Sequence, residues 1–360
     1  LNKNTTGCFN QAVGSFALGC NTEGCQNVAM GMSALIANTT GDNNVAIGRL
    51  SLTTNTTADN NTAVGFESLK LNTTASYNTA VGAYSMDATT TGCKNTAVGF
   101  NSLGANTTGD DNVAIGQNSL RYATTADANT AVGICSLFKT TTGAKNVGIG
   151  TCALICNLTG EENTAVGFNA LRETTTGGSN VAVGQDTMRC NTTGASNTAV
   201  GREALCKNTT AANNTAVGKR ALYVNTEGHT NVAIGKEALL ANTTANYNTA
   251  VGTEALKAQT TGWSNVAVGY YSLVAQTTGA CNVAVGVQAG DSVTTGVENV
   301  FVGSFAGANV TTGDNNLLLG DNAGKDSVRN VTTGDHSIVI GNNSHATAHI
   351  KIDWTVTSDE

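Results

Sequence analysis

Hydrophobic and polar positions follow one short phrase that returns every seventeen residues, twenty times in all. The phrase is Asn-(Thr/Val)-Ala-(Val/Ile)-Gly, and its glycine recurs at constant spacing from Gly14 to Gly320; only the last step, to Gly341, is longer, at twenty-one residues. We number each repeat from its asparagine, so that the glycine is position 5. A strict period of this length is typical of a solenoid, in which each coil stacks on its neighbours.

The repeat predicts β-strands. Glycine at position 5 and Thr-Thr-Gly at positions 13 to 15 would interrupt a helix in every repeat. Apolar residues at positions 4 and 9 lie on two segments separated by glycine-containing turns, which indicates a flattened coil. We therefore predict an all-β fold, a parallel β-solenoid or β-roll of about twenty coils of seventeen residues. At about 4.8 Å per coil, the rod is on the order of 95 Å long.

The apolar columns are the predicted core. Position 4 is apolar in all twenty repeats, and position 9 is Leu or Met in the first sixteen. The core candidates are Val64, Val98, Val183 and Ile234 at position 4, and Leu69, Leu103, Leu171 and Leu239 at position 9.

Small residues form a second stripe on the other face of the strand, because side chains alternate along it. Position 3 is alanine in sixteen of twenty repeats, and position 5 is always glycine. Such a stripe would allow an identical chain to approach closely. We therefore predict a fibre in which copies of the chain are related by closed cyclic symmetry, as a homotrimer. The candidates for packing between chains are Ala63, Gly65, Ala182, Gly184, Ala233 and Gly235.

Asparagine occupies position 1 in nineteen of twenty repeats. Stacked asparagines can hydrogen-bond along the column, which predicts a structural ladder. The ladder candidates are Asn61, Asn95, Asn180 and Asn231. The Asn-Thr-Thr-Gly segments are predicted turns; several match the glycosylation pattern, but the turn alone explains these residues.

Three parts are predicted: a regular shaft over 1–286, atypical coils over 287–343, and an extended exit segment over 344–360 leading to a further domain. The atypical coils exchange large and small residues, as expected for repeats that cap a stack. Because the chain begins within a repeat, we expect a longer polypeptide. The exchanged residues are Gly290, Gly307 and Gly324 at position 9, and Phe301, Leu318 and Val339 at position 3.

Composition restricts the partners. The net charge is -7, only 12% of residues are charged, and no basic cluster is visible, which argues against nucleic acid and anionic membranes. No run of about eighteen apolar residues exists for membrane insertion. Charged and aromatic residues gather at positions 6, 7, 10 and 11, a wall that is either simply solvated or able to bind glycan or protein weakly by repetition.

Ten cysteines occupy shared columns. Cys8 with Cys25, and Cys135 with Cys152, lie on adjacent coils, where their Cα atoms would be about 5 Å apart, within disulfide range. Free thiols and stacked disulfides both remain open. Nothing resembles the Cys-x-x-Cys pairs of a metal site.

No catalytic, cofactor or metal site is predicted. The histidines His345 and His349 could gather around a trimer axis to hold a metal, although solvated histidines are the simpler interpretation. Acidic neighbours such as Glu161 and Glu162 do not converge on a cleft. Aspartates in Gly-Asp-Asn turns lack calcium-repeat spacing, so surface turns explain them. They are Asp42, Asp110 and Asp314.

The phrase Asn-Val-Ala-Ile-Gly at 44–48 and 231–235 resembles the head repeats of trimeric autotransporter adhesins, and the Asn-Thr-Ala-Val-Gly arrays are similar to those of phage and large-virus tail fibres. The resemblance implies parallel β-rolls around a threefold axis. The closing residues 354–360 resemble the start of the intramolecular chaperone domain that follows many phage fibres. Ser358 matches by position the serine of self-cleaving members, but the lysine and the rest of that domain are absent, so no activity is assigned.

We therefore expect a structural protein, the shaft of a viral tail fibre that acts outside the cell in host attachment, with itself and a host glycan or protein receptor as partners. The main alternative is a trimeric adhesin on a bacterial surface. An ice-binding solenoid, suggested by rows of threonine, and a glycan depolymerase rank below these.

Overall fold

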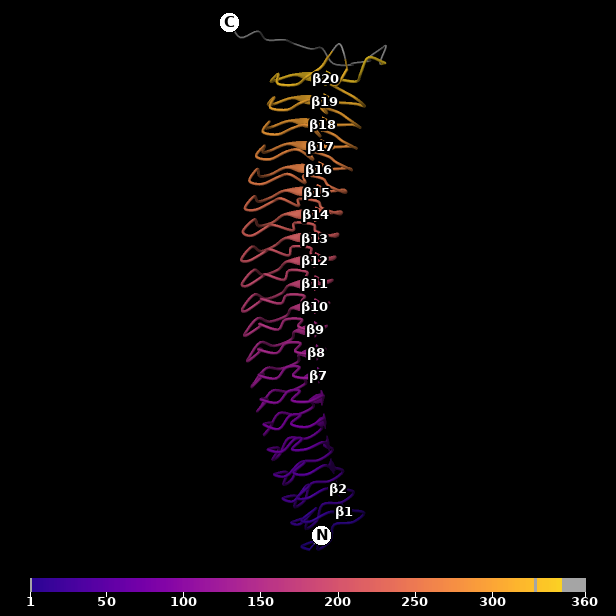
Figure 1. The fold of residues 1–360 in the computed structure, drawn as a ribbon, viewed down its shortest axis with the longest axis vertical. Helices are drawn as coiled ribbons and strands as arrows, with labels where there is room; N and C mark the ends of the chain where they lie inside the picture. Colours follow the sequence, from indigo (N-terminus) through magenta and orange to yellow (C-terminus); the bar gives the residue numbers. More distant parts are fainter. Residues whose placement is uncertain (1, 327–328, 345–360) are drawn as a thin grey trace, which may run out of the picture.

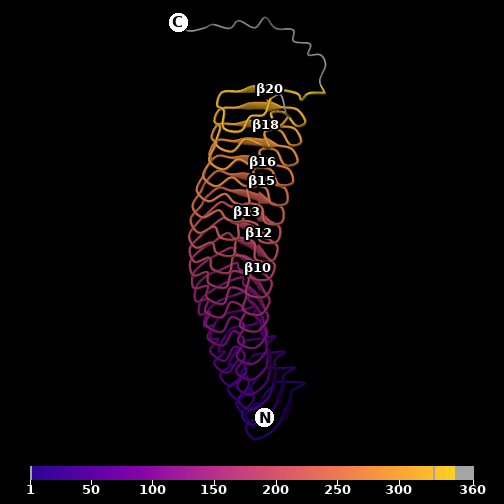
Figure 2. The same cartoon turned by 45° about the horizontal axis from the view of Figure 1, so that its top comes forward.

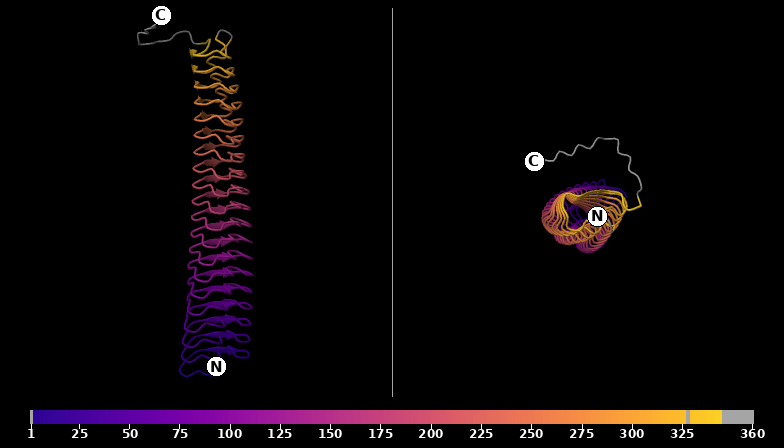
Figure 3. Two further views of the ribbon diagram at one scale, coloured as in Figure 1. Left: turned by 90° about the vertical axis from the view of Figure 1, so that its left-hand side faces the viewer. Right: turned by 90° about the horizontal axis from the view of Figure 1, so that it is seen from above.

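The structure is a computed structural model that describes residues 2–326 and 329–344. They form a long, gently curved stack of flattened coils with β1 at one end and β20 at the other (Figures 1 and 2). Successive coils rotate slightly about the long axis, so that their outlines fan out when seen from above (Figure 3). Every regular element in the described part is a short strand, which confirms the parallel β-solenoid. The strands are β1 (Gln11–Val13), β2 (Val28–Met30), β3 (Val45–Ile47), β4 (Thr62–Val64), β5 (Thr79–Val81), β6 (Thr96–Val98), β7 (Val113–Ile115), β8 (Thr130–Val132), β9 (Val147–Ile149), β10 (Thr164–Val166), β11 (Val181–Val183), β12 (Thr198–Val200), β13 (Thr215–Val217), β14 (Val232–Ile234), β15 (Thr249–Val251), β16 (Val266–Val268), β17 (Val283–Val285), β18 (Val300–Val302), β19 (Leu317–Leu319) and β20 (Ile338–Ile340).

Each strand pairs in parallel with the strand of the next coil. In the pair β10 and β11, Ala165 lies opposite Ala182, so equal positions of the repeat face each other. The four extra residues of the last repeat lie outside the sheet, because Leu317 of β19 still pairs with Ile338 of β20. Constant register therefore turns each position of the repeat into a continuous column.

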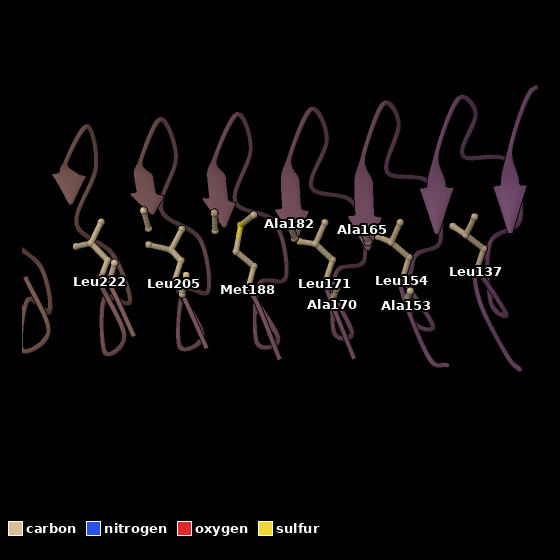
Figure 4. Close-up of a cluster of buried hydrophobic side chains, with 14 of the residues drawn as sticks. Leu137, Ala153, Leu154, Ala165, Ala170, Leu171, Ala182, Met188, Leu205 and Leu222 are labelled. Atoms are coloured by element: carbon tan, nitrogen blue, oxygen red, sulfur yellow. The ribbon is translucent and has the colours of Figure 1, made fainter. Parts of the chain in front are cut away.

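The core is a row of leucines facing a row of alanines. Leu171 at position 9 and Ala182 at position 3 are both fully buried. Figure 4 shows the leucine row, with Met188 in it, projecting toward the strands that carry the alanines. The four predicted leucines are fully buried, as expected; they are Leu69, Leu103, Leu171 and Leu239.

The predicted core role of position 4 is wrong. Strand alternation turns this column outward, and Val98 and Ile234 remain 36% and 40% exposed. Val64 and Val183 are half-buried. The physical reason is the volume of the interior. The leucine of position 9 fills most of the space inside the coil, so the inward face of the strand has room only for alanine at position 3. The larger β-branched residues of positions 2 and 4 therefore face solvent.

The predicted packing of chains through the alanines of position 3 is also wrong. Ala63, Ala182 and Ala233 are fully buried inside their own coils, so no second chain can reach them. The glycines are required within the chain instead, because φ is +143° at Gly65, +132° at Gly184 and +137° at Gly235. These values suit glycine and turn the backbone sharply after each strand.

Leucine at position 9 adopts a left-handed backbone that is uncommon for residues other than glycine. At Leu171, φ is +50°. Its N–H donates to the Thr187 carbonyl oxygen on the next coil at 3.0 Å, so bonding between coils holds this conformation. The side chain is thereby directed into the core.

The atypical coils fill the same interior from the opposite side. Gly290 and Gly307 keep the positive φ of position 9 without a side chain, and Phe301 at position 3 is fully buried. A Cβ added to Gly290 would lie 2.7 Å from Cδ2 of Phe301, which shows that the ring occupies the vacated leucine space. Leu318 fills the space at Gly324 in the same way, because a Cβ added to Gly324 would lie 2.7 Å from Cδ1 of Leu318. The exit segment predicted over 344–360 lies outside the described residues beyond Ser344, as do His345, His349 and Ser358.

The asparagines of position 1 form the expected ladder. Asn180 is fully buried; its Oδ1 accepts the backbone N–H of Asn197 at 3.0 Å, and its Nδ2 donates to the Gly194 carbonyl at 2.9 Å. The first bond links two coils, and the second closes one coil on itself. The same backbone bond joins Asn61, Asn95 and Asn231 to the preceding asparagine of the column, at 3.0, 2.9 and 2.9 Å.

A second ladder at position 12 was not predicted. Asn38 is fully buried, and its Nδ2 donates to Asn21 Oδ1 at 2.8 Å and to the Gly41 carbonyl at 2.9 Å. The segment is a turn, as predicted, but its asparagine points inward. Burial of the amide explains why the glycosylation pattern recurs here without needing a glycan.

We expect Gly184→Val to lower the free energy of unfolding by about 2 kcal/mol or more, because valine disfavours φ of +132°. Its Cβ would also lie 2.8 Å from the backbone carbon of Gly201 on the next coil. Urea unfolding measures the change. Gly178→Ala is the control, since alanine occupies the same position 16 at Ala195. Equal unfolding midpoints for the two variants would contradict this account of position 5.

Asn180→Ala should cost about 1–3 kcal/mol, because it leaves the buried N–H of Asn197 without its acceptor and removes one of the two amide donors, Asn180 and Asn191, that bond the Gly194 carbonyl. Hydrogen exchange at the Asn197 amide should accelerate together with the loss of stability. The exposed Thr176→Ala serves as the control and should change stability by less than about 0.5 kcal/mol. Unchanged exchange at Asn197 would show that the ladder bond does not protect it.

Candidate functional site

The outer surface of the sheet is the most regular exposed feature of the molecule. We call it the β-branched face: the outward side chains at positions 2 and 4 of β2 to β19. Position 2 is mostly Thr or Val, position 4 mostly Val or Ile, and no charged residue occurs in either column. Exposure of position 4 is substantial, for example 40% at both Ile115 and Ile149.

The size of this face is at the upper end of what a lone soluble chain exposes. The strip is about 90 Å long, with about 7 Å between its two rows. Its flat area is therefore on the order of 600 Å², without the additional surface of the protruding side chains. Contiguous apolar patches beyond a few hundred Å² mark contact surfaces. The face therefore has the extent and chemistry of an interface.

The wall at positions 6, 7, 10 and 11 is different, because its residues vary from coil to coil. Between β12 and β15 it carries a chain of ion pairs: Arg220 lies 3.6 Å from Glu203 and 3.9 Å from Glu237, and Lys257 lies 2.9 Å from both Glu237 and Glu254. The hydrogen bond from Lys257 lowers the pKa of Glu237. These partly exposed pairs neutralise one another along the wall.

An aromatic row occupies another part of the wall. The Tyr84 ring stands edge-on between Phe66, at 5.2 Å, and Phe100, at 6.0 Å between centroids. The Arg49 guanidinium lies over Phe66 at 5.6 Å. Phe100 is 47% exposed, so this row offers apolar edges to a ligand while its members support one another.

The wall is recessed where position 10 is glycine, which has no side chain. At Gly104 a cavity of about 220 Å³ opens between Asp87 on one side and Arg121 and Tyr122 on the other. Burial raises the pKa of Asp87, and the Arg121 guanidinium lies 5.3 Å from the Tyr122 ring. A second hollow lies at Gly19. These are shallow recesses and provide no converging pair of carboxylates.

The aspartates that follow the turn glycine at position 15 have a structural role. At position 16 their carboxylates accept a backbone N–H from the previous coil: Asp42 from Cys25 at 2.6 Å, Asp110 from Cys93 at 2.6 Å, and Asp314 from Val297 at 2.8 Å. Among residues 2–326 and 329–344, no group of three or more metal-binding side chains comes together. The same residues include no helix of the length and hydropathy needed to cross a membrane.

No family model matches the chain, and no curated protein matches it. The candidate sites therefore depend on the geometry alone.

We expect Glu237→Gln to lower the free energy of unfolding by about 1 kcal/mol or less at neutral pH, since its ion pairs are near solvent. The lowered pKa of Glu237 means that this contribution is present above the ordinary value of 4.5 and is lost as the pH falls through the lowered value. Urea unfolding at several pH values measures it. Glu227→Gln, at an exposed turn, is the control. If the free energies of unfolding of Glu237→Gln and the unaltered protein still differed at a pH where Glu237 is fully protonated, the cause would be something other than its charge.

Proposed function

We propose that this chain is the shaft of a homotrimeric attachment fibre, carried outside the cell on a virus such as a tailed phage. The elongated stack supports a spacer role, because twenty strands in one column extend the chain along a single axis. The repeat phrase supports it as well, since it resembles the arrays of tail fibres. No catalytic role is part of this proposal.

The single observation behind the trimer is the β-branched face. Water contacts an uncharged strip along the described stack, although the chain can place charge elsewhere, as at Arg220 and Lys257. Stable interfaces bury about 800 Å² per partner, and the strip alone reaches this order of size. Copies related by a closed rotation would cover it in all chains at once. The Ala/Gly stripe has no part in this proposal.

Recognition then belongs to the wall, which stays outside when the β-branched faces meet. Its exposed aromatic and polar groups, such as Phe100 and the residues around Gly104, suit weak contacts to a host glycan or protein that repetition in three chains would strengthen. The same shaft would also serve a trimeric adhesin on a bacterial surface; an outer-membrane anchor on the full-length polypeptide would distinguish that alternative.

A second function is favoured by the outward threonines of position 2. Thr62, Thr79 and Thr96 follow one another on adjacent strands, beside the exposed column of position 4. Regular rows of threonine and valine on the outside of a β-solenoid can match an ice lattice. This candidate requires the face to be free of other chains, so the two functions are mutually exclusive on the same surface.

The oligomeric state tests the proposal. We expect light scattering to give three times the chain mass of 36.4 kDa, and electron microscopy to show rods about 90 Å long. Replacing Val81, Ile115 and Ile149 together by lysine should give single chains, because three charges would be buried in each interface. The sites lie on alternate coils, which separates the new charges within one chain.

The matched control places lysine at Thr91, Thr125 and Thr159, exposed on the opposite turn of the same coils, and should remain trimeric. Circular dichroism should report an unchanged β-fold for both variants. A single-chain mass for the unaltered protein would refute the trimeric fibre, and thermal hysteresis of that monomer in freezing solution would then establish ice binding.

A further inference from the structure

Two cysteines of the same column lie in contact on successive coils. Cys8 and Cys25 both occupy position 16, three residues before β1 and β2. Their sulfur atoms are 2.7 Å apart, and the backbone N–H of Cys8 donates to the Cys25 sulfur at 3.1 Å. Non-bonded heavy atoms pack at about 3.5–4.0 Å, so the two sulfurs are already much closer than packing alone would place them.

The backbone geometry of this pair suits a covalent bond. Neighbouring parallel segments are about 4.8 Å apart, and disulfides join Cα atoms separated by about 4.4–6.8 Å. Closing the sulfurs to about 2.05 Å requires a movement of less than about 1 Å. Cys8 is exposed and Cys25 is partly exposed, so a small oxidant can reach them.

We propose that Cys8 and Cys25 form a disulfide that joins the first two coils of the described stack. The oxidant is a low-molecular-weight disulfide such as oxidised glutathione. The Cys25 thiolate attacks one glutathione sulfur and releases the other as glutathione thiolate. Cys8 then loses its proton to solvent and attacks the Cys25 sulfur, which releases the second glutathione. Two protein thiols become one disulfide, and one glutathione disulfide becomes two thiols.

The hydrogen bond between the two thiols affects the rate of this reaction. Donation of the Cys8 S–H to the Cys25 sulfur is the main cause that raises the pKa of Cys8. Cys8 therefore keeps its proton in the reduced pair and the first attack falls to Cys25; because both attacks require a thiolate, oxidation should quicken as the pH rises.

The other adjacent pairs are less suited to bonding. Cys135 and Cys152 share position 7, but no hydrogen bond between their sulfurs occurs in the part of the chain that the structure describes. Burial raises the pKa of Cys135. Cys206, beside Cys190, is buried, and burial raises the pKa of its thiol to about 11, which suppresses its reactivity. The proposal therefore assigns one pair among ten cysteines.

The cross-link would close a seventeen-residue loop and restrict opening of the two coils. Disulfides persist in oxidising surroundings, where a fibre outside the cell would work. The inference does not depend on the fibre, however, because the contact between sulfurs belongs to a single chain.

The test oxidises the full chain with glutathione disulfide, traps the remaining thiols with N-ethylmaleimide, and cleaves after Glu23, which lies between the two cysteines. Mass spectrometry without reduction should find the two fragments linked through Cys8 and Cys25, with neither of these cysteines carrying maleimide or glutathione. A Cys20→Ser background removes the other thiol of the first fragment. Hydrogen exchange across the two coils should slow on oxidation.

Cys93 provides the internal control, because it occupies the same position 16 but has Ser76 and Asp110 as column neighbours. It should collect a glutathione adduct without forming an internal bond. In Cys25→Ser, Cys8 should behave like Cys93, and the fold should persist because Ser76 already occupies this column. Unlinked fragments, with Cys8 and Cys25 carrying adducts to the same extent as Cys93, would overturn the proposal.

Discussion

Each regular coil closes around a narrow interior in which the leucine or methionine of position 9 faces a small residue, usually alanine, at position 3, beside a buried Ala, Ser or Thr at position 8, and this limit on volume governs the rest of the molecule. Leu171 and Ala182 are both fully buried, and the backbone on each side is bonded to the next coil. Phe301 at position 3 is accommodated between Gly290 and Gly307, where position 9 is reduced to glycine. The two columns therefore vary together to preserve one cross-section.

Buried asparagine side chains supply hydrogen-bond partners to backbone groups that the short strands leave unpaired. Three-residue strands leave most N–H and C=O groups outside the regular sheet, and buried groups of this kind are costly when unpaired. Asn180 satisfies an N–H of the next coil and a carbonyl of its own, and Asn38 satisfies a carbonyl at the opposite turn. Polar side chains thus complete the interior that the small apolar core leaves unfinished.

The sequence was sufficient to predict the solenoid, its parallel register and the leucine column, because a fixed period repeats each environment in every coil. It did not reveal which face of the strand is inside. Valine at position 4 is more hydrophobic than alanine at position 3, yet Ala182 is buried and Val183 lies on the outer face, since available volume outweighs hydrophobicity here. The constancy of alanine was the available signal: a residue facing a free surface has no reason to remain so small. The position 12 ladder was missed because Asn-Thr-Thr-Gly is equally typical of an exposed turn.

This correction also changes what the outer surface implies. The limit on interior volume accounts for alanine at position 3, and φ accounts for glycine at position 5, but neither explains why position 4 stays apolar where Ile115 and Ile149 face solvent. The wall shows that this scaffold tolerates charge, as in the ion pairs of Arg220. The two exposed surfaces of the same coils therefore differ in composition: the β-branched face is uncharged and nearly constant, and the wall varies from coil to coil and includes charged residues. Such a division is expected when one surface is covered by copies of the chain and the other remains in contact with water.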